Sequence, residues 1–179
     1  MKVLLRRVGD VPSEALLRAK GAVERETGLR ALVEPTTYQP SLSAYDWERG
    51  QYVASALLSS LGPVEGFLTL YLIDADAYEA GLNFVFGLAI PSLGVAGVFL
   101  KRLKNEFYGW PPDEELFLRR VEKEVLHELG HLLGLEHCPN PKCVMSFSNS
   151  IEEVDFKEAR FCEECKKKLV GRLSRSGSY

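Results

Sequence analysis

Every histidine and every cysteine of this 179-residue chain lies between positions 127 and 165. The histidines are His127, His131 and His137, and the cysteines are Cys138, Cys143, Cys162 and Cys165. Imidazole and thiolate groups are the side chains that proteins use most often to bind zinc. The sequence therefore predicts a chain that folds around metal in its C-terminal third.

Two of the histidines are four residues apart in the segment His127-Glu128-Leu129-Gly130-His131. On an α-helix this spacing places both rings on one face, about 6 Å apart along the axis, where they can bind one zinc ion. Glu128 lies about 100° around the helix, so it can flank the metal without binding it. The same short pattern also occurs by chance on helices that bind no metal.

Gly134 explains how the third histidine joins the first two. If the helix continued, His137 would lie about 15 Å beyond His127 along the axis. Glycine adopts the left-handed conformation that ends a helix and turns the chain back. Three histidines then leave the fourth coordination position of zinc open to water. Zinc lowers the pKa of this bound water from about 15.7 to about 7. Glu128 is the expected general base that accepts its proton. No second group for the oxyanion is evident.

The four cysteines form two pairs, and Cys162-x-x-Cys165 stands at the expected start of a helix. Two such pairs fit a tetrahedral four-thiolate zinc, which is closed to water and therefore structural. Cys138 directly follows His137, so this site is expected to anchor the loop that carries the third histidine. The alternatives are free buried cysteines, disulfides, or a zinc ribbon that binds nucleic acid.

Charge and hydropathy limit the partners of the chain. The net charge is −3, from 22 basic and 25 acidic residues, which does not favour nucleic acid. The N-terminus lacks a signal-peptide pattern. The stretch 81–100 carries no charge, but Pro91 and several glycines interrupt it, which indicates two strands joined by a turn and not a membrane-spanning helix. We expect a cytoplasmic monomer with no membrane partner, in which reduced cysteines hold metal.

Hydrophobic periodicity predicts alternating strands and helices. Strands are expected at residues 2–8, 29–33, 66–73, 84–90 and 94–100, and helices at 12–27, 48–61, 111–134 and about 155–168. This order indicates an α/β (α+β) fold with a mixed sheet and helices packed on it. We expect one domain over 1–179, with the sheet and active-site helix in 1–134 and a C-terminal part in 135–179.

The combined motif resembles the metzincin metallopeptidases, with three histidines, Glu128 and Gly134 at the family's spacing. With Met145 and the four cysteines added, residues 127–165 resemble one small metzincin family, the archaemetzincins. The resemblance implies a metzincin-like fold, with a twisted mixed sheet, an antiparallel edge strand, a long active-site helix and a small C-terminal subdomain stapled by zinc. By the same analogy, residues 94–100 are the candidate edge strand, which would pair with an extended peptide.

The resemblance also implies a function. It implies a zinc metallopeptidase that acts on peptides or proteins, including short peptides or aminopeptidase-like substrates. It further implies two zinc ions per chain, one on the three histidines with Glu128 as base and one on the four cysteines, and Met145 as the Met-turn residue beneath the imidazoles. Some metzincins carry a zinc-binding tyrosine just after the Met-turn, and residues 146–150 contain none.

Two other functions compete with peptide hydrolysis. A family of bacterial endoribonucleases also places three histidines at this spacing, usually with glycine where this chain has Glu128. RNA cleavage would favour a basic surface, which this composition does not supply. A zinc module without hydrolytic activity is the other alternative, and metal analysis together with RNA incubation would separate the three.

Overall fold

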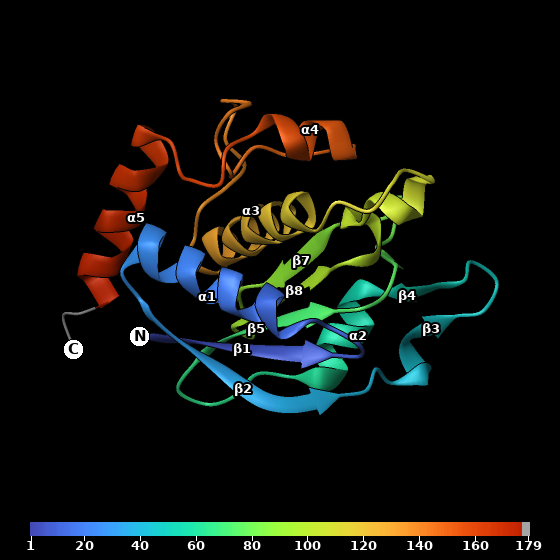
Figure 1. The fold of residues 1–179 in the computed structure, drawn as a ribbon. Helices are drawn as coiled ribbons and strands as arrows, with labels where there is room; N and C mark the ends of the chain where they lie inside the picture. Colours follow the sequence, from blue (N-terminus) through green and yellow to red (C-terminus); the bar gives the residue numbers. More distant parts are fainter. Residues whose placement is uncertain (177–179) are drawn as a thin grey trace.

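The computed structural model describes residues 1–176 (Figure 1). The longer helices are α1 (Ser13–Thr27), α2 (Ala54–Leu61), α3 (Glu114–Leu132), α4 (Ile151–Phe156) and α5 (Glu163–Ser176). The strands are β1 (Lys2–Val8), β2 (Arg30–Tyr38), β3 (Tyr45–Asp46), β4 (Gln51–Val53), β5 (Leu68–Ile73), β6 (Ala77–Tyr78), β7 (Gly87–Ile90) and β8 (Val95–Phe99). Short 3-10 helices lie at Leu42–Ala44, Lys101–Leu103 and Asn105–Tyr108.

The main sheet has five strands in the order β2-β1-β5-β8-β7. The first four are parallel, and β7 runs antiparallel to β8 at one edge. The smaller sheet has the order β3-β4-β6. The predicted mixed sheet with an antiparallel edge strand is therefore present.

The assignment of residues 94–100 to the edge is wrong. Gly97 of β8 lies between Tyr71 of β5 and Leu88 of β7, so β8 is an inner strand. All five residues of β8 are buried, as expected for a parallel strand covered on both faces, whereas β7 is partly exposed along its length. The edge strand is β7, the first strand of the predicted pair.

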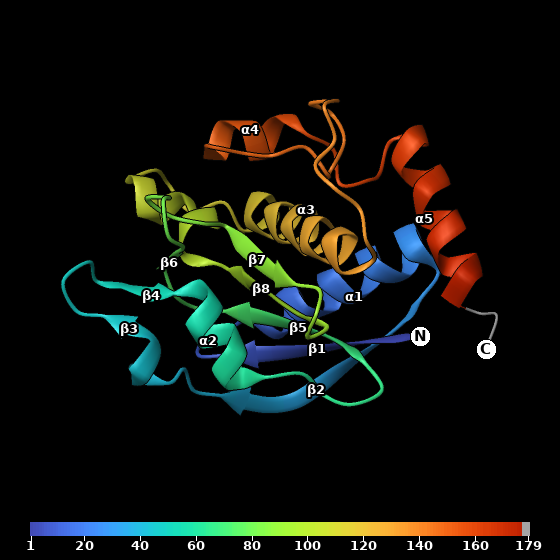
Figure 2. The same cartoon turned by 180° about the vertical axis from the view of Figure 1, so that it is seen from behind.

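Helices cover both faces of the main sheet (Figures 1 and 2). Successive residues of a strand point to opposite faces, so each strand contributes side chains to two hydrophobic clusters. Leu70 and Leu72 of β5 belong to the cluster under α1 and α3, whereas the alternate residues Tyr71 and Ile73 pack with Leu57 and other residues of α2. The C-terminal segment then passes over α3, with α4 above that helix (Figure 1) and α5 beside its C-terminal end, where Arg172 lies against Gly134.

Three of the predicted helices have different boundaries in the structure. Residues 48–53 form a turn and β4, because Gln51 is buried there and bonds to Asp76, so α2 begins only at Ala54. The predicted 155–168 helix is two helices, because Lys157 is extended (φ −74°, ψ 161°) and its side chain is buried against α3. Finally, α3 begins at Glu114, after the N-cap Asp113, and ends at Leu132, two residues before Gly134.

No helix within residues 1–176 has both the length and the apolar character needed to cross a membrane. The last three residues of the predicted C-terminal part lie outside the described residues.

Candidate functional site

The three histidine rings converge at the C-terminal end of α3. His127 and His131 project from that helix, and His137 comes from the loop that follows it. The ring centroids are 4.8, 4.9 and 5.2 Å apart, and one nitrogen of each ring lies within 4.8 Å of the other two. The structure therefore brings together all three predicted histidines.

A helix-ending turn places His137 in this group. Gly134 has φ +90°, its N–H donates to the carbonyl of His131 at 3.0 Å, and the N–H of Leu135 donates to the carbonyl of Gly130 at 2.9 Å. These paired bonds around a left-handed glycine form a Schellman motif. The turn predicted at Gly134 is present, and it sends the chain back along α3.

Backbone carbonyls orient the two helical histidines. The Nδ1 atom of His127 lies 2.8 Å from the carbonyl of Val144, and that of His131 lies 2.9 Å from the carbonyl of Leu135. Because a carbonyl only accepts, each Nδ1 carries the proton, and each Nε2 therefore carries a lone pair. Burial lowers the pKa of His127 well below its usual value and also lowers the pKa of His131, which favours the neutral form of both rings.

This arrangement fits a metal ion. The Nε2 atoms of His127 and His131 are only 3.2 Å apart. Two neutral imidazoles with their lone pairs turned toward each other repel unless a cation lies between them. His137 completes the set, and desolvation of its ring likewise lowers its pKa. Three neutral imidazoles are the donor set of a catalytic zinc that keeps one open position.

Glu128 lies on the side of α3 that faces the edge strand. It is buried, and a Cβ atom added to Gly87 of β7 would lie 2.8 Å from its Cγ and 2.9 Å from its Oε1. Glycine at position 87 therefore lets this carboxylate lie directly against the edge strand. Burial, reinforced by the charge of Glu124, raises the pKa of Glu128 well above the usual value, and Lys157 opposes this shift.

Met145 lies beneath the same turn of α3. It is fully buried, and its carbonyl accepts a hydrogen bond from the N–H of Cys138 at 3.0 Å. A Cβ atom on Gly130 would stand 2.3 Å from the Met145 sulfur. The glycine between the two histidines therefore makes room for this methionine.

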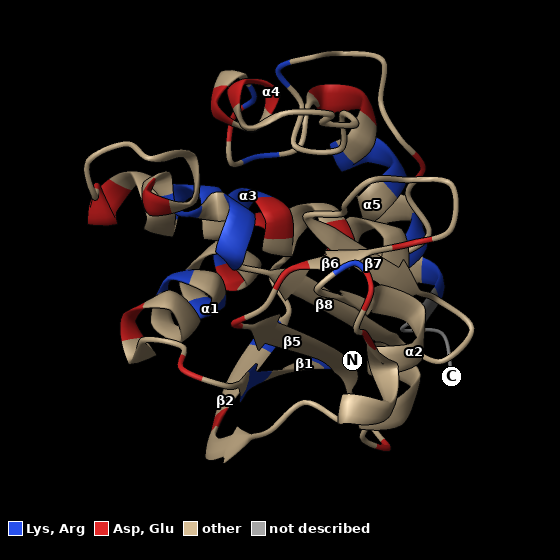
Figure 3. Ribbon diagram, turned by 90° about the vertical axis from the view of Figure 1, so that its right-hand side faces the viewer, with Lys and Arg blue, Asp and Glu red and all other residues tan. Residues whose placement is uncertain are grey.

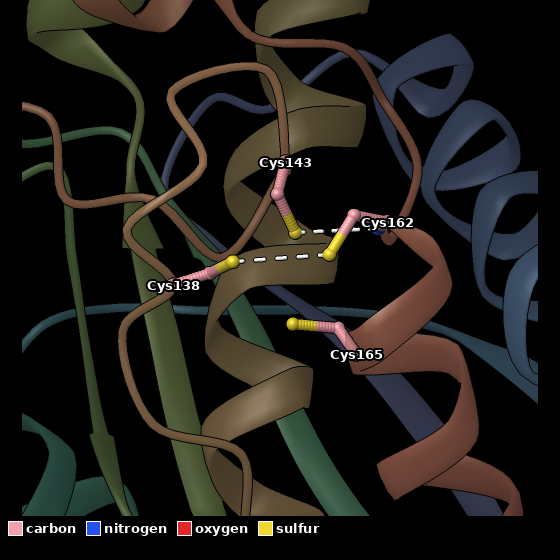
Figure 4. A group of neighbouring side chains, drawn as sticks. All are labelled: Cys138, Cys143, Cys162 and Cys165. Atoms are coloured by element: carbon pink, nitrogen blue, oxygen red, sulfur yellow. Dashed lines mark hydrogen bonds between the residues drawn. The ribbon is translucent and has the colours of Figure 1, made fainter.

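The four cysteines form a second cluster beside α3 (Figure 4). Cys138 and Cys143 come from the loop after His137, and Cys162 and Cys165 come from the start of α5. All four are free thiols whose sulfurs lie within 4.8 Å of one another. The 3.8 Å between the sulfurs of Cys138 and Cys162 equals the edge of a tetrahedron with zinc–sulfur bonds of about 2.3 Å. Four converging thiols with no disulfide fit a structural zinc.

A cleft of about 270 Å³ opens beside Glu128. Segments 81–87 and 147–149 form its walls, and Glu124 and Lys157 lie deep within it. The Lys157 ammonium is 3.1 Å from Glu124 Oε1, and these side chains are 0% and 4% exposed. Sequence reasoning missed this ion pair. The only available signal was the spacing of Glu124 and Glu128, one helical turn apart.

Known proteins share the sequence pattern and the fold of this chain. A family model described as Peptidase family M54 matches residues 29–171. The archaemetzincin of Pyrococcus furiosus is 43% identical over 176 residues, covering 94% of this chain and 92% of the relative.

Two solved structures share the fold. One is an archaemetzincin from Methanopyrus kandleri, with a TM-score of 0.84, 40% identity and coverage of 97% of both chains. The other is a zinc-dependent peptidase from Methanocorpusculum labreanum, with a TM-score of 0.84, 31% identity and coverage of 94% of this chain and 100% of that one. These matches confirm the predicted fold class and extend the family likeness to the N-terminal sheet. The chain therefore belongs to the archaemetzincins, a family of zinc-dependent metallopeptidases.

Proposed function

We propose that His127, His131 and His137 hold the catalytic zinc of this metallopeptidase and that Glu128 is its general base. Support comes from the two Nε2 lone pairs that face each other across 3.2 Å, because this is the observation that most directly calls for a cation. Family membership favours hydrolysis of peptide bonds over the two alternatives, RNA cleavage and metal binding without hydrolysis.

The residues of the chain divide the chemistry among them. When bound, zinc supplies a Lewis acid that lowers the pKa of water and polarises the scissile carbonyl. The Glu128 carboxylate accepts a proton from the attacking water and later donates it to the leaving amine. The carbonyls of Val144 and Leu135 accept hydrogen bonds from the Nδ1 atoms of two histidines, which leaves the Nε2 atoms as the groups that would bind the metal.

We infer that the substrate binds along β7. This strand pairs only with β8 in the main sheet, so its outer edge is free to hydrogen-bond an extended peptide. The contact between Gly87 and Glu128 puts that edge next to the general base. A peptide docked there would present its backbone to Glu128 without a large conformational change.

The four cysteines are proposed to hold the structural zinc, and Met145 to be the Met-turn residue beneath the metal-binding rings. The direct sequence link between His137 and Cys138 supports a positioning role for the cysteine site. We also propose that the chain consists of a sheet part (1–134) and a C-terminal part (135–179) that the zinc on the four cysteines holds together.

The variant Glu128→Gln tests the assignment of the base. It keeps the size of the side chain and removes its basicity, so peptide hydrolysis should fall by about 10²–10⁴-fold. Metal analysis should still find two zinc ions per chain, because Glu128 is not a ligand. Hydrolysis at the wild-type rate in this variant would refute the proposed role.

The cellular setting is proposed from composition. We propose a cytoplasmic monomer that does not bind nucleic acid. Four thiols without a disulfide favour a reducing compartment, and the net charge of −3 disfavours nucleic acid as a partner. Both α1 and α3 carry acidic as well as basic residues (Figure 3). Light scattering would test the monomer, and labelled RNA incubated with and without chelator would test for nuclease activity.

A further inference from the structure

The loop between β6 and β7 (residues 79–86, the β6–β7 loop) leads into the edge strand next to the general base. Gly87, the residue that follows the loop, lies against Glu128, and residues 81–86 line the cleft beside it. A peptide that adds to the edge of β7 and continues past Gly87 therefore runs along this loop. How firmly the loop is held should then affect how well a peptide binds.

The tip of the β6–β7 loop has no hydrophobic anchor. All four residues from Ala80 to Asn83 are exposed. A segment without buried apolar side chains opens at low cost, so its position depends on its hydrogen bonds. Within residues 1–176, the side chains that donate to the backbone of this tip are those of Arg49 and Gln51.

Both donors come from the small sheet, about 30 positions earlier in the chain. Arg49 lies in the turn between β3 and β4, and its Nη2 donates to the carbonyls of Leu82 at 3.3 Å and Asn83 at 3.0 Å. Gln51 is the first residue of β4, and its Nε2 donates to the carbonyl of Asn83 at 3.1 Å. The small sheet therefore holds the tip of a loop that lines the cleft.

The Arg49 guanidinium is itself held in place. It lies 3.6 Å from the centre of the Tyr78 ring, in a cation–π contact, and its Nε donates to Gln51 Oε1 at 3.0 Å. The carboxylate of Asp46 fixes the turn, because it accepts bonds from the N–H groups of Glu48 and Arg49 at 3.1 and 3.2 Å. It also accepts one from the Tyr78 hydroxyl at 2.6 Å. Arg49 is therefore a preorganised donor.

Gln51 belongs to a polar network that reaches the next residue of the loop. Gln51 is buried, and its Nε2 also donates to Asp76 Oδ2 at 3.1 Å. Arg102 donates to both oxygens of Asp76 at 2.6 and 2.9 Å, and its guanidinium lies 4.4 Å from the centre of the Phe84 ring. Because paired polar networks of this kind favour a single arrangement, the network fixes the loop at positions 83 and 84.

We propose that Arg49 is a positioning residue for peptide hydrolysis, which together with Gln51 fixes the β6–β7 loop beside the path of the substrate. The proposal rests on the proposed function, because it takes the edge of β7 as that path. It goes further by giving the small sheet a role in substrate binding.

Amide hydrogen exchange of the zinc-loaded protein tests the contact without any substrate. Arg49→Ala removes both bonds to the loop, and the protein should still fold because Arg49 is exposed. The amides of Leu82 and Val85, which donate to the carbonyls of Glu79 and Ala77, should exchange about tenfold faster, as for the loss of one hydrogen bond to a charged group. Unchanged exchange of these two amides would overturn the proposal.

Arg30→Ala is the matched control. It removes the same charge from an exposed position on β2, at the opposite edge of the main sheet. The exchange of the loop amides should stay at the wild-type rate in this variant. Equal acceleration in both variants would show that the loop responds to charge and not to the Arg49 contact, which would overturn the proposal.

Steady-state kinetics test whether the contact affects substrate binding. With an eight-residue peptide cleaved at its centre, Arg49→Ala should raise KM about tenfold and change kcat less than about threefold, the pattern of a lost binding interaction. Arg30→Ala should keep both constants. Acetohydroxamate binds metal but carries no peptide, so it should inhibit the wild type and both variants equally. A wild-type KM in Arg49→Ala, or weaker inhibition of that variant by acetohydroxamate, would overturn the proposal.

The wild-type protein separates this proposal from the proposed function. If the wild type cleaves the peptide and Arg49→Ala cleaves it with the same KM, the positioning role fails and the metallopeptidase site stands. If the wild type neither cleaves peptides nor binds acetohydroxamate, the proposed site itself fails, and the positioning role fails with it.

Discussion

The variant Gly87→Ala should lose most of its peptidase activity while it still folds. The added methyl carbon would lie 2.8 Å from Cγ of Glu128 and 2.8 Å from the backbone carbonyl oxygen of Gly97. Carbon atoms pack at about 3.5–4.0 Å, so the Glu128 side chain must move by about 0.7–1.2 Å. A displacement of about 1 Å at a reacting group costs about 10²-fold, which is the fall in kcat/KM that we expect.

The same substitution should lower stability only moderately. Overpacking by one methyl group costs about 1–3 kcal/mol, which corresponds to a Tm lower by roughly 2–12 °C in a chain of this size. Gly87 does not have a positive φ, so alanine adds no backbone strain. Zinc content should stay at two ions per chain, because no proposed ligand touches the new methyl group.

Gly97→Ala is the matched control for this experiment. Its methyl group would lie 2.6 Å from Leu58 and 3.1 Å from Ile73, on the α2 side of the sheet and away from Glu128. We expect a similar loss of Tm with near wild-type kcat/KM at temperatures where the variant is folded. The reasoning is refuted if Gly87→Ala hydrolyses peptides normally, or if both variants lose activity equally.

Two further predictions concern the C-terminal part. Cys143→Ser should reduce the zinc content from two ions to one and lower Tm, because a site with three thiolates binds zinc more weakly; metal analysis that still finds two ions would contradict the cysteine assignment. Arg120→Met should destabilise the protein by about 3 kcal/mol, since the buried guanidinium bonds both oxygens of Asp155 at 2.7 Å and the carbonyl of Leu103 at 2.9 Å. Thermal unfolding should then show Tm lower by roughly 6–12 °C, and an unchanged Tm would mean that Arg120 does not anchor α4 to α3.

The features predicted correctly are those that depend on neighbours in the sequence. Each of these features involves residues no more than about two helical turns apart in the sequence: the spacing of His127 and His131, the turn at Gly134 and the Cys162-x-x-Cys165 pair. Local geometry therefore fixes their placement before any tertiary contact is known. The strand–turn–strand pairing of β7 and β8 was predictable for the same reason.

The errors and omissions depend on long-range packing. Which strand of the β7–β8 pair lies at the edge depends on the pairing of β8 with β5, which no local pattern reveals. Lys157 breaks a helix by reaching Glu124, 33 positions earlier in the chain, and in the sequence it resembles any other lysine in a charged stretch. The polar interior of the cleft could therefore be found only in the structure.

The hydrogen bonds from His127 and His131 to the carbonyls of Val144 and Leu135 limit how far the histidine motif could be transplanted. Grafted onto an isolated helix, the same five residues would keep their spacing but lose both acceptors, and each ring would then exchange freely between its two tautomers. An engineer who borrows this motif would need to bring the returning loop with it, because that loop selects the nitrogen that faces the metal.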